Sequence, residues 1–357
     1  MPDRDPRQPP VEYSHADSEG VGSISGDLAT SLRKANNPSS SKISQQYLLD
    51  LIAVGQEIRS APPQEAMSLS YMANMLVRIS MPHRVRKGQH TFSRTWDGTT
   101  LSIMAPAHIG LPSGTIPRMI MAWLTTEAVV KKSPIVSLGD SFPAFLRDLG
   151  FHSRSGGVRG VASRVKDQLN RTFSSVFHID RSQRIESSRG RIITRDDSAG
   201  LIVASKRSLW WETGDCEEGV NSNSWIKLSQ EFFDEITDRP VPVDMRALRA
   251  LTYSPLALDI YVWAAVKSFY VADKLVIPWG ELHSQFGTGY PQTPEGTRYF
   301  RKAFRQQLQQ VRLVYEDLKV DDSSAQNLVF YKSKIHVPRE PLSELIQRPR
   351  LGRSKYS

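Results

Sequence analysis

The twenty residues from Gly296 to Tyr315 carry five arginines and lysines and no acidic residue. The apolar residues recur at steps of four, four, three and four, which predicts one buried stripe of an α-helix: Phe300, Phe304, Leu308, Val311 and Tyr315. The basic residues lie mostly off this stripe: Arg298, Arg301, Lys302, Arg305 and Arg312. Some of them are four residues apart, a spacing at which like charges on a helix repel. Unless this is a plain solvated face, the charge predicts a polyanionic partner.

A second stretch, GGVRGVASRVKDQLNRTFSSV at 156–176, shows the same division. Its apolar residues again form one helical stripe: Val161, Val165, Leu169, Phe173 and Val176. The predicted exposed side is basic apart from Asp167: Arg159, Arg164, Lys166 and Arg171. The glycines in SGGVRG suit a helix start at which backbone N–H groups approach a phosphate, or form an ordinary turn. We therefore take both stretches as candidate DNA-binding helices.

The sequence lacks the residue constellations of common enzymes. It contains no G-x-x-x-x-G-K-[ST] phosphate loop, and the eight histidines never stand one residue apart, as a metal-dependent nickase would require. We expect His283 to be a packed histidine and Asp196-Asp197 and Asp321-Asp322 to form turns rather than a magnesium site. The acidic stretch GDCEEG at 214–219 is either a solvated loop or a site for a cation or basic partner. We expect no catalytic residue, no metal and no cofactor.

Composition sets the class of protein. With 357 residues, a net charge of +9 and a pI near 9.6, the chain favours two domains and a partner among nucleic acids, anionic membranes or acidic proteins. Cys216 is the only cysteine, so no intramolecular disulfide is possible and a reducing cytoplasm fits. The apolar run MIMAWL is far shorter than the ~20 residues of a membrane span. The start of the chain lacks the apolar segment of a signal peptide.

The elements that position the two basic helices occur twice. TIPRMIMAWLTTEAVV predicts a helix, IVSLGDSFPAFLRDLGF a short strand and helix, and the basic helix follows. SPLALDIYVWAAVKSF and LVIPWGELHSQFG repeat that order before the second basic helix. Trp123 corresponds to Trp263, Gly150 to Gly287 and Leu169 to Leu308, at offsets of 140, 137 and 139. Such constant offsets indicate a duplication.

Strand-like sequence with an Asp-Asp turn follows each basic helix, at RIITRDDSAGLIVASKR and LKVDDSSAQNLVFYKSKIHV. Three helices and a β-hairpin are typical of the winged helix, whose third helix enters the major groove. The expected class is α+β, with two tandem winged-helix domains after a disordered N-terminal segment. The expected boundaries are 1–42 disordered, 43–65 amphipathic helix or linker, 66–235 first domain with a hairpin from His90 to Ala105, 236–337 second domain, and 338–357 a basic tail.

These blocks resemble the RepA-type plasmid replication initiators. The residues that carry the resemblance are GLPSGTIPRMIMAWLTTEAV, SLGDSFPAFLRDLG, SPLALDIYVWAAVKSF, IPWGELHSQFG and FRKAFRQQLQQV, within about residues 90–337. The resemblance implies a bacterial cytoplasmic protein that binds double-stranded DNA at repeated sites (iterons) of a plasmid origin. It further implies local duplex opening, recruitment of the host replicative helicase and initiator proteins, and a homodimer in equilibrium with a monomer. From the extra elements before the first repeat, we expect residues 44–105 to take part in the dimer.

Two other readings stay open from the sequence. A transcriptional repressor, autoregulatory or not, would use the same domains. A nickase or a purely structural module whose charge serves solubility would belong to other classes, separable by covalent attachment to origin DNA and by the salt dependence of DNA binding.

Overall fold

The computed structural model describes residues 45–139, 141–151, 160–186, 192–209, 224–287 and 289–338. The chain divides between Leu49 and Asp50 into two units, and the contacts described below all lie in the second. The predicted disordered segment 1–42, the acidic stretch 214–219 and the basic tail from 339 onward fall outside the described residues.

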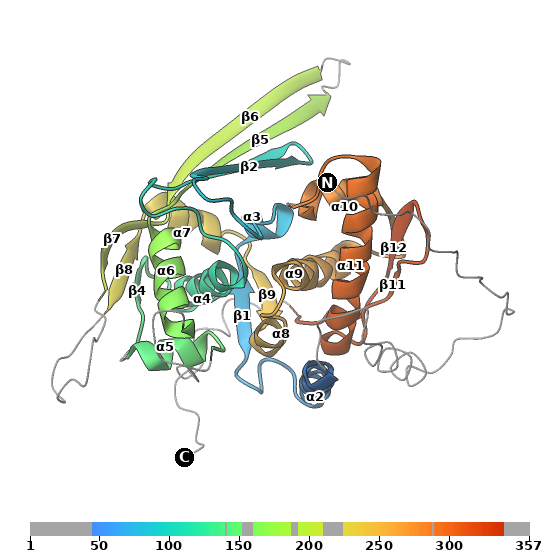
Figure 1. The fold of residues 1–357 in the computed structure, drawn as a ribbon, viewed down its shortest axis with the longest axis horizontal. Coiled ribbons are helices and arrows are strands. Elements are labelled where there is room, and N and C mark those ends of the chain that lie inside the picture. The colour runs from blue at the N-terminus through green and yellow to red at the C-terminus, as the bar shows by residue number, and fades with distance from the viewer. Residues whose placement is uncertain are drawn as a thin grey trace, which may run out of the picture. The chain divides into compact units, whose positions relative to one another are not determined.

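The described chain is α+β, as expected (Figure 1). Its elements follow in this order: α2 (Gln45–Ser60), β1 (Leu69–Met72), α3 (Asn74–Arg78), β2 (Thr91–Trp96), β3 (Thr99–Met104), α4 (Thr115–Lys131), β4 (Ile135–Ser137), α5 (Phe142–Asp148), α6 (Val161–Phe173), β5 (Val176–Glu186), β6 (Ile192–Ile202), β7 (Ala204–Ser208), β8 (Trp225–Leu228), α7 (Gln230–Thr237), β9 (Val241–Asp244), α8 (Met245–Ala250), α9 (Pro255–Tyr270), β10 (Lys274–Pro278), α10 (Trp279–Phe286), α11 (Pro294–Val314), β11 (Val320–Asp321) and β12 (Asn327–Tyr331).

The same order of elements occurs twice. We call α4, β4, α5, α6, β7 and β8 the first module, and α9, β10, α10, α11, β11 and β12 the second. Each module has a three-stranded sheet in which the first strand pairs with the last, in the orders β4-β8-β7 and β10-β12-β11. The two predicted basic helices are α6 and α11, each the third helix of its module. We call the two final strands of each module its wing: β7 and β8 in the first module, and β11 and β12 in the second.

The expected position of the first wing is wrong. The sequence RIITRDDSAGLIVASKR does not follow α6 as a wing, because its first part is strand β6, which pairs with β5 over eleven residue pairs. Asp196 and Asp197 therefore lie within a strand, opposite Ser182 and Arg181, and not in a turn. Strands β5 and β6 extend the β2–β3 hairpin into a sheet of order β2-β3-β5-β6. The wing comes after this inserted hairpin.

Helices α4 and α9 form the centre of the fold and contact each other, α4 packing on α6 and α9 on α11 (Figure 1). Both are buried almost all round, including Trp123 of α4 and Trp263 of α9. A helix that is apolar on every side is stable only inside a core. Strand β1 pairs antiparallel with β9, which joins a segment before the first module to one before the second.

Helix α2 packs against the end of α11. Leu51 is fully buried, and a Cβ atom on Gly55 would overlap the carbonyl oxygen of Leu313 in α11. Glycine at this position therefore lets the two backbones approach more closely than any larger residue would allow. The sequence leaves residues 43–65 as an amphipathic helix or a linker and does not show what would cover an apolar side; the structure has a helix at Gln45–Ser60.

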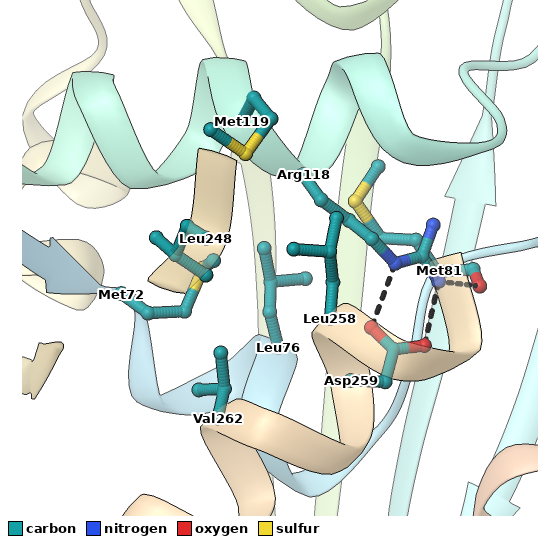
Figure 2. A pocket seen from close by; sticks show the side chains of 9 residues that line it. All are labelled: Met72, Leu76, Met81, Arg118, Met119, Leu248, Leu258, Asp259 and Val262. Atoms are coloured by element: carbon teal, nitrogen blue, oxygen red, sulfur yellow. Dashed lines mark hydrogen bonds and ion pairs between the residues drawn. The ribbon is translucent and has the colours of Figure 1, made fainter. Parts of the chain in front are cut away.

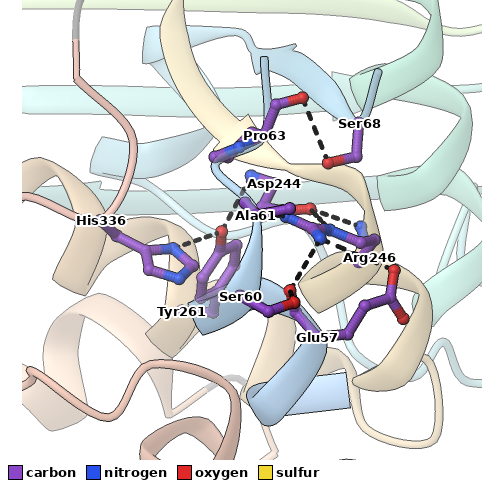
Figure 3. Close-up of polar contacts among 9 residues, drawn as sticks. All are labelled: Glu57, Ser60, Ala61, Pro63, Ser68, Asp244, Arg246, Tyr261 and His336. Carbon is purple, nitrogen blue, oxygen red and sulfur yellow. Dashed lines mark hydrogen bonds and ion pairs between the residues drawn. The ribbon is translucent and has the colours of Figure 1, made fainter. Parts of the chain in front are cut away.

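A polar network holds the end of α2 to β9 and α8 (Figure 3). Arg246 forms an ion pair of 2.7 Å with the buried Asp244 and donates to the carbonyl oxygen of Ala61 at 2.8 Å. The Asp244 amide donates to the Tyr261 hydroxyl at 2.9 Å, and that hydroxyl lies 3.0 Å from Nδ1 of His336. Because the hydroxyl oxygen already accepts one hydrogen bond, its own hydrogen is available to Nδ1. Burial accordingly lowers the pKa of His336 to about 4.

Candidate nucleic-acid interface

The start of α11 is fixed by its cap. The Thr293 side chain accepts a hydrogen bond from the Gly296 amide at 3.1 Å, and Pro294 occupies the first turn, where its missing N–H costs nothing. The apolar stripe predicted for this helix is buried: Phe300, Phe304, Leu308, Val311 and Tyr315. Phe304 packs edge-on against Trp263 and Trp279, with ring centroids 6.3 and 5.6 Å apart.

Three arginines of α11 are bound to the wing of their own module. Arg301 donates to the carbonyl oxygen of Ala325. Arg305 donates to the carbonyl oxygens of Ser323 and Ser324, each at 3.0 Å, and its guanidinium lies 5.4 Å from the centroid of the Trp279 ring. These carbonyls belong to the turn between β11 and β12 and have no strand partner there, so the guanidinium groups satisfy them.

One carboxylate completes this arrangement. Asp322 forms ion pairs with Arg312 at 3.1 Å and with Arg305 at 3.8 Å, and Arg312 also donates to the carbonyl oxygen of Val320. Asp321 accepts a hydrogen bond from the Ser323 amide at 2.9 Å, which is the turn chemistry expected for this pair of aspartates. The wing of the second module is thus held in place by side chains of α11.

Arg298 and Lys302 point away from these contacts. Both are exposed, and within the described part of the chain neither forms an ion pair with an acidic side chain. The Arg298 guanidinium lies 5.5 Å from the ring centroid of Tyr299, whose side chain is also exposed. Of the four residues predicted for this helix, two therefore face solvent while Arg301 and Arg305 are engaged with the wing.

The first module divides its charges in a similar way. Arg164 is exposed on α6, whereas Lys166 lies 5.0 Å from the ring centroid of Phe142. Arg171 pairs with Asp167 at 2.8 Å and donates to the carbonyl oxygen of Leu111, before α4, at 3.3 Å. The fourth predicted residue, Arg159, lies outside the described residues.

Arg207 is a residue of this surface that the sequence reading did not select. It extends from wing strand β7 to α6, where it donates to the Asn170 side chain at 2.8 Å and to the Ser174 hydroxyl at 3.0 Å. Burial lowers the pKa of its guanidinium. In both modules an arginine therefore joins the third helix to the wing, although it comes from the wing in one and from the helix in the other. An arginine in an isolated strand gives no sign of this role.

A buried ionic cluster joins the two modules (Figure 2). Arg118 of α4 forms a bidentate pair with Asp259 of α9, at 2.7 Å and 2.8 Å. The remaining N–H groups of Arg118 bind the carbonyl oxygens of Met81 at 2.6 Å and Gly114 at 2.7 Å. His83 lies 2.8 Å from the same carboxylate.

The electrostatics of this cluster follow from its burial. Desolvation acts to raise the pKa of Asp259, but the charge of Arg118 and the hydrogen bond from His83 hold that pKa below its usual range. Desolvation lowers the pKa of His83, which is therefore neutral and donates to Asp259. The adjoining cavity measures about 10 Å³, which is room for no more than one water molecule. The cluster is therefore a structural joint and not a ligand site.

The other sequence expectations concern packing. His283 is buried, stacks on Phe300 at 5.2 Å and hydrogen-bonds Thr297, which confirms a packed histidine. Trp263 and Trp279 lie in the core, and the Trp279 indole donates to the Ser324 carbonyl oxygen. Among the described residues, no three His, Cys, Asp or Glu side chains group as metal ligands, and no helix is long and apolar enough to cross a membrane.

Comparison with known proteins gives a match to one family model. Residues 111–280, which include α4 to α6 and reach into α10, match the family model described as plasmid encoded RepA protein. This match confirms the expected resemblance to the RepA-type plasmid replication initiators over residues 111–280. A search of curated proteins gives no match.

Two structures of domains 2 and 3 of RctB are similar to this chain. One has a TM-score of 0.47 at 15% identity, and the other a TM-score of 0.43 at 13% identity. Each alignment covers 73% of this chain and 98% of the RctB chain.

Proposed function

We propose that this protein is a plasmid replication initiator, which binds repeated sites at a plasmid origin, promotes opening of the adjacent duplex and recruits the host replication machinery. The family match over residues 111–280 is the observation that carries the initiator role. In this proposal the protein has no enzymatic activity and no cofactor, and acts by recognising and deforming DNA.

In this proposal both modules are winged helices. Helices α6 and α11 enter major grooves while basic side chains bind phosphates. The outward cations of α11, Arg298 and Lys302, support it, since nothing acidic in the described chain neutralises them. Arg164 is an exposed cation of α6. Because α4 and α9 pack together, both third helices belong to one body, which suits two groove segments of one site.

The protein would form a homodimer in equilibrium with a monomer, with residues 44–105 in the interface. One open face of the β2-β3-β5-β6 sheet supports this. Met104 and Ile202, on the same face by their register with Val176, are 44% and 52% exposed. Apolar residues gathered on an open sheet face favour association.

The test of the proposed function is a footprint on the origin of the plasmid that encodes the chain, combined with plasmid maintenance. We expect regularly spaced protected repeats, and loss of maintenance when Arg298 and Lys302 are both replaced by Ala. Single replacement of Arg298 should cost about 1 to 3 kcal/mol of binding to the specific site. The matched control is Lys319→Ala, an exposed cation beyond the end of α11.

The second candidate is a transcriptional repressor with the same DNA-binding modules. It predicts protection at a promoter only, and a plasmid whose origin still replicates when the protein is removed. Replication without the protein would exclude the initiator role and leave DNA binding intact.

A further inference from the structure

The exposed side of α11 forms one continuous stripe. Its residues are separated by three, one, three, four and three positions, which places them on one face of a helix: Glu295, Arg298, Tyr299, Lys302, Gln306 and Gln309. One border of the stripe is formed by the arginines that hold the wing, and from Gly296 onward the other residues on the remaining surface of the helix are buried or half-buried. The stripe and the wing therefore share one side of the module.

The side chains in the stripe are of the types that read base edges. Arginine and lysine bind the O6 and N7 acceptors of guanine, and glutamine matches the N6 donor and N7 acceptor of adenine. Neither Arg298, Lys302 nor Gln306 is used in a hydrogen bond or ion pair in the part of the chain that the structure describes. Their polar groups are thus available to a ligand.

The length of the stripe sets which of its residues reach bases. Arg298 and Gln306 are eight residues apart, or about 12 Å along a helix, which matches three to four base-pair steps of about 3.4 Å. A straight helix leaves the curved floor of the groove beyond that length. Gln309, a further turn along, therefore falls level with the phosphates.

We propose that Arg298, Lys302 and Gln306 are the base-reading residues of the second module, with Gln306 recognising adenine and the two cations recognising guanine. This rests on the proposed DNA binding by α11. Tyr299 is a positioning residue, because the Arg298 guanidinium lies over its ring. Arg301, Arg305 and Arg312 make no base contact, because their guanidinium groups hold the wing.

The experiment is selection of bound sequences from a random double-stranded DNA pool by the full chain. Wild type should enrich a motif with one position at which adenine is required. Gln306→Ala should remove the preference there, by about 5- to 150-fold in relative affinity. Gln306→Glu should change the preferred base to cytosine, because a carboxylate accepts from the cytosine N4 amine. Gln56→Ala and Gln56→Glu, on the exposed side of α2, are the matched controls and should leave the motif unchanged.

The outcomes separate this inference from the proposed function. If wild type enriches a motif that both Gln306 variants also select, with folded helices by circular dichroism, the assignment of Gln306 is wrong while DNA binding stands. If wild type enriches no sequence, both fail. Arg305→Ala should weaken binding to every sequence without changing the motif, and a change at one base position would overturn its assignment to the wing.

Discussion

Replacing Asp259 by Asn tests what the buried Arg118–Asp259 pair contributes to the joint between the modules. The substitution keeps the volume of the side chain and one oxygen that can accept a hydrogen bond, but it removes the charge. Arg118 is only 3% exposed, so its charge would stay buried with carbonyl oxygens alone as partners. Removing one partner of a buried pair costs about 3 to 5 kcal/mol. Because the amide retains one hydrogen bond, we expect the lower end, about 3 kcal/mol.

The measurement is urea unfolding followed by tryptophan fluorescence and circular dichroism. The pair joins α4 to α9, so its loss should also separate a single transition into two, since each module then unfolds more independently. Asp238→Asn, at a side chain that is 77% exposed, is the control and should change stability by less than about 0.5 kcal/mol. The double variant Arg118→Met, Asp259→Leu should recover part of the loss, because an apolar pair leaves no buried charge although the carbonyl oxygens of Met81 and Gly114 lose a donor.

The reasoning would be refuted if Asp259→Asn unfolded like the Asp238 control. It would also be refuted if the double variant were no more stable than Asp259→Asn alone. Either result would mean that apolar packing of α4 on α9 is sufficient to hold the modules together.

Three further predictions concern other parts of the molecule. Burial lowers the pKa of His336 to about 4 from 6.5, so between these values the unfolded chain binds a proton that the folded chain does not. Lowering the pH from 7.5 to 5 should therefore remove about 2 kcal/mol of stability. Replacement of His336 by Asn should flatten this pH dependence in unfolding titrations. Gly55→Ala should destabilise by about 1 to 3 kcal/mol, because a Cβ meets the Leu313 carbonyl, whereas Ala53→Val on the exposed side of α2 should not. Met104→Glu should shift sedimentation towards the monomer without loss of helix content, and an unchanged dimer would count against the proposed sheet interface.

The repeated helices could be predicted because their burial follows a simple period. The helix predicted at 296–315 is observed at Pro294–Val314, and the stripe from Phe300 to Tyr315 is buried. The Asp97-Gly98 hairpin is equally local, since both residues adopt positive φ, 47° and 66°, as a tight turn requires. Such features depend only on neighbours along the chain.

The position of the first wing could not be predicted because the sequence does not show which strands pair with each other. Residues 191–207 have the composition of a wing, and β6 is indeed a strand, but it pairs with β5 in a sheet begun by the β2–β3 hairpin. Alternation of apolar and polar residues shows that a strand exists and which face is buried, not which strand lies beside it. An inserted hairpin therefore looks like the element that it displaces.

The buried joint was missed for a related reason. Arg118 stands in the first turns of an apolar helix, where an arginine usually extends to solvent. Its partner Asp259 is 141 residues away, on another helix. A single cation in an apolar segment indicates that some partner must exist, but only the packing of α4 on α9 identifies it.

The basic residues of α11 have two different roles, and the sequence shows only that the helix is basic. Arg301, Arg305 and Arg312 satisfy wing carbonyls and Asp322, so they are required whether or not DNA is bound. Only Arg298 and Lys302 remain for a polyanion. Each phosphate charge that a cation neutralises contributes about 0.9 to the slope of log K against log salt, so these two base-reading cations account for a slope of at most about two. We therefore expect the slope to fall by no more than that when both are replaced by Ala. A fall near four would mean that the arginines holding the wing leave its carbonyl oxygens when DNA binds. The division of α11 into residues that read bases and arginines that hold the wing would then have to be abandoned.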